Sequence, residues 1–468
     1  MGNIFMSGWS RGAKVLALTS IGVMLVSLDI SIVNVAFGSF VEQWPESRRT
    51  LTWVFSAYNI AYAAGLLTAG RLADAFGRKR AFLSGLTIFM IGSLLCALAP
   101  SALLLVCARI IQALGGAILT PASLALVLPE FPVERRSAAI GIWGAVGGVA
   151  AASGPTLGGY LVDNFGWHSV FLINVPLCLI ALAIGARLLH ESRDGTAPRT
   201  VDYLGALLAV GGVALLTLVI VQSDEWGWVS TRSLVVFAIS ALFLSAFLVR
   251  CNSVAHPVLD LRLFKLPFVT AAALSGFVFT MGFFSMIFVN VQWLQLVWGY
   301  SPSLSGLAGS PGPIAAAIVA APAGRLAQRV GHGRVVAVGA LVLSSGTLLL
   351  HFLLTPTPHY WDLYLPIMTY TGIGVGLCIA TITSSATAYL PQPKFAMGSA
   401  LNNTARQIGA ALGVALVSSM LVAASKTDDS ISGFHHAWIF ISVAVAITGV
   451  TMLALFRKPT IEQLAAAT

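Results

Sequence analysis

Charged residues are scarce in this chain of 468 residues. Only 9% of them are Asp, Glu, Lys or Arg, whereas 57% are hydrophobic and the mean hydropathy is +0.88. A soluble protein carries about 25% charged residues, because its surface faces water. The composition therefore excludes a soluble protein and indicates an integral membrane protein.

Motifs for several chemistries are also missing. The sequence has no GxxxxGK[ST] phosphate-binding loop, which argues against a pump with its own ATPase. His351 is the one histidine expected inside an apolar run, and no nucleophile, base or metal ligands cluster around it. We therefore expect no enzymatic activity and no cofactor or metal. The cysteines all fall in or beside apolar runs, which leaves no extracellular disulfide framework: Cys96, Cys107, Cys178, Cys251 and Cys378.

Apolar runs of about 20 residues, each long enough to cross ~30 Å of hydrocarbon as a helix, recur along the chain. The first run contains Asp29, is longer than a signal-peptide core and is not followed by a small-residue cleavage site, so it predicts a span. We count fourteen runs, at residues 14–36, 51–70, 81–99, 102–126, 138–161, 168–189, 203–222, 232–250, 267–290, 304–324, 335–354, 362–389, 398–424 and 436–456.

The basic residues predict the orientation in the membrane. With the N-terminus in the cytoplasm, most of the 26 lysines and arginines fall on the cytoplasmic side, and only Arg48, Arg49, Arg232 and Lys426 fall outside. This asymmetry follows the positive-inside rule and predicts that both termini are cytoplasmic. The net charge of +9 then reflects topology and anionic lipid, not a nucleic-acid partner.

The chain also contains an internal repeat. The segment GRLADAFGRKR at 70–80 recurs as GRLAQRVGHGR at 324–334, with a constant offset of 254 residues. A transporter built from two related bundles with a substrate site between them has such a repeat. The offset predicts a six-helix bundle over 1–189, a linker with two inserted helices over 190–262 and a second six-helix bundle over 263–468.

The first copy of the repeat is expected to form a polar loop that acts as a cytoplasmic gate. Asp74 would latch the gate by accepting from a helix N-terminus or an arginine, while the glycines permit tight turns. Positive-inside anchoring explains the basic residues but not Asp74, and the second copy has Gln328 at that position. The candidate gate residues are Gly70, Arg71, Asp74, Gly77 and Arg78.

Asp29 alone of the 17 acidic residues lies deep inside a predicted span. A carboxylate there costs ~2.5–3.5 kcal/mol or more and usually serves a function. Arg109 lies near the start of the run at 102–126, which is the outer end of that run in the predicted orientation. Counted from there, it reaches a similar depth in the membrane, so the two side chains can pair. We interpret Asp29 as a proton carrier whose charge state depends on burial, Arg109 and hydration. A static salt bridge and a direct substrate contact are the alternatives.

Other polar groups inside the runs have two interpretations each. Gln112 shares a helix face with Arg109, and Asn34 lies near Asp29; both serve either the substrate or ordinary interhelical hydrogen bonding. Arg406 has no acidic residue in its own run, so it is either structural, which we favour, or a contact for an anionic part of the substrate.

Aromatic side chains supply candidates for an apolar substrate pocket with few polar anchors. Packing and the interfacial aromatic belt are the common alternative. The candidates are Tyr58, Trp143, Phe279, Phe283, Phe284, Gln292 and Trp293.

Small residues recur in the run at 138–161. Gly144, Gly148, Gly154 and Gly158 stand at helical spacings, and Pro155 is able to bend the helix. Such residues let two helix backbones approach closely.

Four segments together resemble the signature set of the major facilitator superfamily, in its drug:proton antiporter branch with fourteen spans. They are the 70–80 loop, RIIQALGGA at 109–117, GIWGAVGGVAAASGPTLGG at 141–159 and SLDISIVNVAF at 27–37. The resemblance implies an all-α membrane fold of two pseudo-symmetric bundles. It also implies that the run from Gly144 to Gly159 is the antiporter motif, which packs on the opposite bundle and limits proton leak.

The resemblance implies a multi-pass protein of the cell membrane, expected to be a monomer, that exports lipophilic drugs, cationic ones among them, in exchange for protons. Within transport, the alternatives are an exporter dedicated to one metabolite or antibiotic and, less favoured, a proton-coupled uptake system. A membrane enzyme would need clustered nucleophile, base or metal-ligand residues, which this sequence lacks. A non-transporting sensor would not need the buried acid, and full function of an Asp29→Asn variant would favour it.

Overall fold

The structure, a computed structural model, describes residues 9–33, 35–51, 53–192, 202–254, 257, 259, 261–390, 395–425 and 430–460. Within this part of the chain every regular element is helical. A helix satisfies its backbone hydrogen bonds internally, which a segment inside hydrocarbon requires. The helices are α1 (Arg11–Ile32), α2 (Phe37–Gln43), α3 (Arg48–Leu51), α4 (Trp53–Phe76), α5 (Arg78–Ala97), α6 (Ala102–Val127), α7 (Val133–Phe165), α8 (Ser169–Leu172), α9 (Asn174–Leu188), α10 (Tyr203–Trp226), α11 (Thr231–Ser253), α12 (Pro267–Gln292), α13 (Pro302–Gly309), α14 (Pro311–Val330), α15 (His332–Leu353), α16 (Leu365–Ser385), α17 (Phe395–Ser425) and α18 (Ser430–Leu455).

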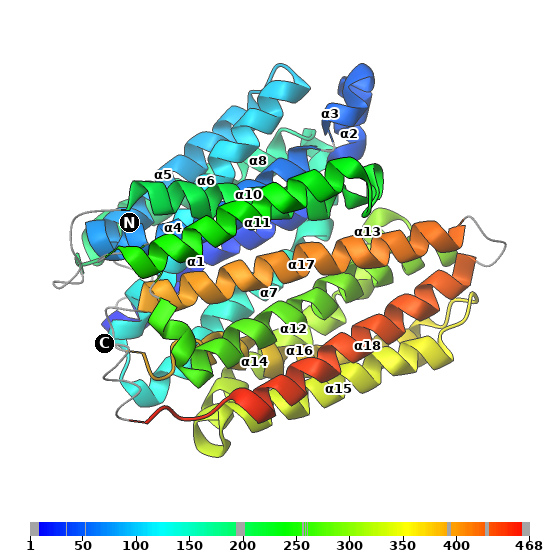
Figure 1. The fold of residues 1–468 in the computed structure, drawn as a ribbon. Helices are drawn as coiled ribbons and strands as arrows, with labels where there is room; N and C mark the ends of the chain where they lie inside the picture. The colour runs from blue at the N-terminus through cyan, green and yellow to red at the C-terminus, as the bar shows by residue number, and fades with distance from the viewer. Residues whose placement is uncertain are drawn as a thin grey trace.

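The helices form two groups with a pair between them. In Figure 1, α1 to α9 (the first bundle, blue to cyan) lie mainly in the upper part, with α7 in the middle, and α12 to α18 (the second bundle) lie mainly in the lower part. The green helices α10 and α11 run across the front. α10 contacts α11, α4 of the first bundle and α17 of the second, while α4 and α17 also contact one another. The inserted pair therefore covers the seam between α4 and α17.

The beginning of α1 and the end of α18 lie at the same end of the molecule, called here the termini end (Figure 1). At this end the two bundles share one apolar cluster, which joins Leu124 of α6 and Ile140 of α7 to Phe268 of α12 and Leu401 of α17. At the opposite, far end the apolar clusters are separate, one within each bundle. The bundles therefore share an apolar cluster at the termini end, and α7 also contacts α13, α14 and α16 of the second bundle.

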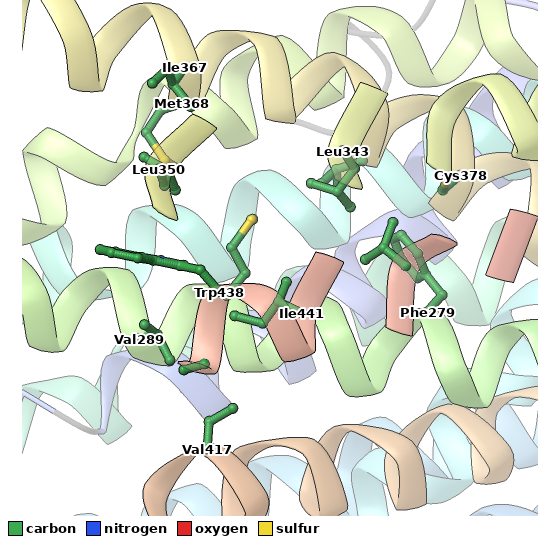
Figure 2. Close-up of a cluster of buried hydrophobic side chains, with 14 of the residues drawn as sticks. Phe279, Val289, Leu343, Leu350, Ile367, Met368, Cys378, Val417, Trp438 and Ile441 are labelled. Atoms are coloured by element: carbon green, nitrogen blue, oxygen red, sulfur yellow. The ribbon is translucent and has the colours of Figure 1, made fainter. Parts of the chain in front are cut away.

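The far end of the second bundle is filled by large side chains. Figure 2 shows Trp438 and Ile441 of α18 facing Val289 of α12, with Leu350 of α15 and Met368 of α16 across the cluster. Trp438 also donates its Nε1 hydrogen to Oδ1 of Asn290 at 3.1 Å. A buried indole needs such an acceptor, so this bond fixes the tryptophan in its packing position.

Twelve of the described helices are long and apolar enough to cross a membrane, or up to thirteen if the bent α7 is one span. This number does not reach the predicted fourteen. The 24-residue α4 is not among the twelve, although ~1.5 Å per residue makes it long enough to span. Its tyrosines, asparagine and serine lower the hydropathy of an otherwise apolar helix.

The prediction of a polar loop from Gly70 to Arg80 is wrong. α4 continues through Gly70 to Phe76, and α5 begins at Arg78, so Gly77 alone breaks the helix. Gly77 has a φ of 110°, a conformation that glycine adopts without strain. The Arg78 side chain is buried. The side chains of Arg71 and Asp74 lie outside the described part of the structure.

The predicted packing of the α7 glycines on the opposite bundle is also wrong for those near the far end. A Cβ atom on Gly154 would collide with Ser31, and one on Gly158 would lie 3.0 Å from the carbonyl oxygen of Ile32. Both neighbours belong to α1 of the same bundle. Gly141 instead faces the second bundle, because its Cβ would lie 2.7 Å from the Ala320 carbonyl oxygen of α14.

The remaining positions of the run differ from one another. No atom lies within 4 Å of the Cβ positions of Gly144 and Gly148, so these two make no close helix contact. Gly159 is buried. α7 bends by 45° between its segments Ala138–Ala151 and Thr156–Phe165, and Pro155 stands at this break, as proline at a kink would.

Replacing Gly158 by leucine should destabilise the first bundle. The new side chain would overpack the α1 contact, which typically costs ~1–3 kcal/mol. We expect a lower midpoint of thermal unfolding for the purified Gly158→Leu protein in detergent. Gly148→Leu is the matched control in the same helix and should change the midpoint little. Equal midpoints for the two variants would contradict the packing described.

Candidate functional site

Asp29 lies on α1 inside the first bundle, and its side chain is completely buried. Arg109 of α6 donates from Nη1 to Oδ2 of Asp29 at 2.5 Å. Gln112 of α6 and Asn174 of α9 donate from their amide nitrogens to Oδ1, at 2.8 and 3.3 Å. Both carboxylate oxygens therefore accept hydrogen bonds, and the predicted Asp29–Arg109 pair exists.

The Arg109 guanidinium is held on several sides. Its Nη1 also donates to Oε1 of Gln112 at 2.7 Å, and its Nε donates to the Val54 carbonyl oxygen at 3.3 Å. The guanidinium carbon lies 3.9 Å from the centre of the Tyr58 ring, in a cation–π arrangement. Arg109 is only 1% exposed, so these contacts replace nearly all of its hydration.

Two members of this cluster were missed by the sequence analysis, Ser93 of α5 and Asn174. The Ser93 hydroxyl oxygen accepts from Gln112 at 3.1 Å and from Asn174 at 3.0 Å, and it donates to the Phe171 carbonyl oxygen at 2.9 Å. Asn174 is the only amide side chain in the run at 168–189, a signal that could have found it. Ser93 offers no comparable signal, because serines are frequent in these helices.

The cluster is a closed polar site within apolar surroundings. Its members come from α1, α4, α5, α6 and α9, all of the first bundle. Asp29 and Arg109 neutralise one another, and breaking such a buried pair would leave an uncompensated charge. Because Asp29 is fully buried, a substrate does not reach it in this arrangement.

Two stacked tyrosines lead from the cluster toward the second bundle. The rings of Tyr58 and Tyr62, one helical turn apart on α4, have centres 6.0 Å apart. The Tyr62 hydroxyl shares a hydrogen bond with Thr120 of α6 at 2.9 Å. Arg406 of α17 lies within electrostatic range of Tyr62 and donates to Oγ1 of Thr383 at 3.3 Å. Arg406 is half-buried, and the described residues give it no acidic partner.

The predicted substrate-binding aromatics do not form one group. Trp143 is buried at the termini end and donates to the Ser123 hydroxyl at 3.1 Å. Trp293 is buried in the other bundle, its ring centre 5.0 Å from that of Trp438. Phe283 and Gln292 of α12 are half-buried. Asn34 lies outside the described residues, so its predicted role is untested.

An apolar groove of about 480 Å³ lies between the bundles on the side away from the inserted pair. It was not predicted from the sequence. Ser153 is the only side chain with a hydroxyl among its lining residues, and the others are apolar. The lining side chains come from α1, α7, α9 and α14: Met24, Leu28, Ile142, Ala145, Val146, Val149, Ala150, Ser153, Leu157, Ile173, Leu177, Ala317 and Ala321.

The fold is that of known membrane transporters. The human organic anion transporter MFSD10 (TETRAN) superposes with a TM-score of 0.64 at 15% identity, covering 95% of this chain and 100% of that one. The proton:xylose symporter XylE superposes with a TM-score of 0.68 at 13% identity, covering 98% and 99%. At these identities the likeness concerns the fold alone.

Sequence comparison gives the family. The model of the Major Facilitator Superfamily matches residues 19–289 and again 272–467. The chain is 34% identical over 411 residues to the multidrug resistance protein Stp of Mycobacterium tuberculosis, covering 87% of this chain and 75% of that relative. It is 30% identical over 450 residues to the methylenomycin A resistance protein of Streptomyces coelicolor, covering 96% and 93%.

The chain therefore belongs to the major facilitator superfamily. It is a multi-pass membrane transporter, not an enzyme, and it is homologous to drug-efflux and antibiotic-resistance proteins. A protein from Bacillus subtilis, also named for methylenomycin A resistance, is 33% identical over 434 residues and covers 92% of each chain.

Removing the cation of the cluster should destabilise the protein. In Arg109→Met the buried carboxylate loses its counter-ion, and breaking a buried pair in this way costs ~3–5 kcal/mol. We expect a marked fall in the midpoint of thermal unfolding in detergent.

The double variant Asp29→Asn/Arg109→Met removes both charges and should recover most of that loss. If Arg109→Met were as stable as the unmodified protein, the Asp29–Arg109 pair would not hold the bundle together.

Proposed function

We propose that this transporter exports lipophilic small molecules in exchange for protons across a cell membrane. Its substrates would be drugs or antibiotics, cationic ones among them. The proposal rests chiefly on one observation, the completely buried Asp29 carboxylate, which accepts from Arg109, Gln112 and Asn174 within a polar cluster built by five helices. The kinship with drug-efflux and resistance proteins supports the direction of transport.

The proposed topology has fourteen spans, counting α4 and the bent α7 with the twelve helices that meet the length and hydropathy criteria. Both termini would be cytoplasmic, which the basic residues of the sequence favour. The two bundles then comprise residues 1–189 and 263–468, with α10 and α11 inserted between them. Under this topology the apolar cluster that the two bundles share would lie on the cytoplasmic side.

The hydrogen bonds around Asp29 suggest how a proton acts. Each carboxylate oxygen accepts from a donor, so a proton arriving on Oδ2 would displace the Arg109 Nη1 hydrogen from it. The guanidinium would keep Gln112, the Val54 carbonyl and the Tyr58 ring as partners. Protonation would thus loosen α1 from α6. It would leave the Arg109 charge without its counter-ion but with its neutral hydrogen-bond and ring partners. A small change of this kind biases two bundle arrangements that differ by a few kcal/mol.

The remaining candidate roles follow from position. The apolar groove would hold a lipophilic substrate. Phe283 and Gln292 of α12 and Arg406 of α17 are half-buried and remain separate candidates for substrate contact, because they do not line the groove. Gly70, Arg71, Asp74, Gly77 and Arg78 would form the cytoplasmic gate. We expect the transporter to act as a monomer, with its seal at the Gly141–Ala320 contact instead of at Gly158.

A titration-deficient carboxyl should uncouple transport. Asn at position 29 keeps the volume but cannot carry a proton, so we expect Asp29→Asn to lose uphill substrate export driven by an imposed pH gradient in liposomes. Asp163→Asn, at an exposed position near the end of α7, is the matched control and should transport normally. Normal uphill export by Asp29→Asn would rule out the carrier role.

The function as a whole is tested by efflux from a host that lacks its own drug pumps. Expression should lower the accumulation of several lipophilic compounds, and a protonophore should abolish the effect. A protonophore-insensitive effect would rule out proton coupling.

The same experiment distinguishes a second candidate, an exporter dedicated to one antibiotic. The two methylenomycin A resistance proteins cover more than nine-tenths of this chain, and their names refer to a single compound. Protection confined to one compound of the panel would favour this narrower function.

A further inference from the structure

A second cavity, of about 540 Å³, lies between the bundles at the termini end. Arg136 and Ile140 of α7 line it from the first bundle. The second bundle contributes the junction of α14 and α15, including His332 and Arg334. Among the described residues that line this cavity, two are arginines and none is acidic. The described lining therefore offers basic side chains and no carboxylate to a ligand.

The N-terminus of α15 opens onto this cavity. Gly331, its N-cap, has a φ of 98°, and no atom lies within 4 Å of the position that a Cβ would take. Within the described structure, no acceptor faces the backbone N–H groups of His332, Gly333 and Arg334. A helix N-terminus with free N–H groups carries about half a positive charge and attracts anions.

His332 gives independent support for a ligand. Its side chain is only 6% exposed and lines the cavity, yet its Nε2 has no hydrogen-bond partner among the described residues. A buried polar atom without a partner is costly, and such atoms are usually satisfied by a group that binds there.

The internal repeat allows the N-terminus of α15 to be compared with the equivalent N-terminus of α5 in the first bundle. Gly77 to Arg80 correspond to Gly331 to Arg334 at the offset of 254 residues. At the N-terminus of α5, the Glu191 carboxylate accepts from the backbone N–H groups of Lys79 at 3.1 Å and Arg80 at 3.3 Å. A Cβ on Gly77 would lie 2.5 Å from that carboxylate, whereas the space at Gly331 is open. The first site contains its own anion, and the second contains a cavity.

We propose that this cavity binds a phosphate group, which takes the place that the Glu191 carboxylate takes in the first bundle. Phosphate oxygens suit the donors, since arginine side chains, an imidazole and backbone N–H groups reach the cavity from different sides. The group comes either from a phospholipid head or from a soluble phosphate. In both cases it contacts residues of the two bundles and holds them together at this end.

The test measures thermal unfolding of the full chain in phosphatidylcholine nanodiscs. Inorganic phosphate is titrated against chloride at equal ionic strength, and a second set of nanodiscs contains phosphatidylglycerol. We expect phosphate, phosphatidylglycerol or both to raise the unfolding midpoint. A response to phosphate alone identifies a soluble source, and a response to phosphatidylglycerol alone identifies the lipid. No response beyond that to chloride overturns the proposal.

Variants locate the effect. Arg334→Gln removes a charged donor and should weaken the apparent affinity about tenfold or more, as expected for the loss of a charge-assisted hydrogen bond. Arg329→Gln removes the same charge from an exposed position of α14 that does not line the cavity, and it should leave the affinity unchanged. Equal weakening by both variants would show only general charge attraction and would overturn the site.

A further variant supplies an internal anion. Gln328 lines the cavity and corresponds to Asp74 of the first copy, so Gln328→Glu places a carboxylate there with little change of shape. This protein should fold normally and no longer respond to phosphate or phosphatidylglycerol. An undiminished response in Gln328→Glu would contradict binding in this cavity.

Discussion

The buried ion pair between Asp29 and Arg109 is the interaction on which the first bundle depends. Two charges inside an apolar bundle are tolerated only when each is neutralised and hydrogen-bonded. Here α1, α4, α6 and α9 contribute direct partners of the two charges, and Ser93 of α5 accepts from two of those partners, Gln112 and Asn174. The pair therefore fixes how α1, α4, α5, α6 and α9 lie against one another. A change in the charge state of the pair therefore alters the contacts between these helices.

Equivalent parts of the two bundles are packed with different kinds of side chain. The far end of the second bundle has no buried carboxylate among its described residues, and a core of large apolar and aromatic side chains surrounds Trp293 and Trp438 there. At the termini end the difference is reversed, because the first bundle caps α5 with Glu191 while α15 faces an open cavity. The repeat preserves the helices and not the chemistry between them.

Composition and hydropathy predicted an all-helical membrane protein well, since both depend only on the solvent around the chain. The depth of Asp29 and Arg109 predicted their pairing, because depth along a helix follows from residue number. The prediction that the α7 glycines pack on the opposite bundle was wrong for those near the far end. Small residues at helical spacing show that something packs closely, but α1 and α14 are equally good partners at that level of information.

Local signals misplaced the ends of helices. The polar segment from Gly70 to Phe76 was read as a loop, yet it continues α4 because helix hydrogen bonding needs no apolar side chains. The span count depended on hydropathy and was least secure for α4, whose tyrosines build the polar site. The polar residues of α4 that build the site therefore lower its hydropathy, which is the property used to predict a membrane span.

The contact between the inserted pair and the two bundles has a mechanical consequence. α10 meets α4 and α17 through small or smooth apolar side chains, including Ala63, Ala64, Val213 and Ile408. Beyond this apolar surface, Trp228, between α10 and α11, donates to the Ser419 hydroxyl of α17 at 3.3 Å. Because most of this contact is apolar and non-directional, we expect the inserted helices to keep the seam covered when the bundles shift relative to one another.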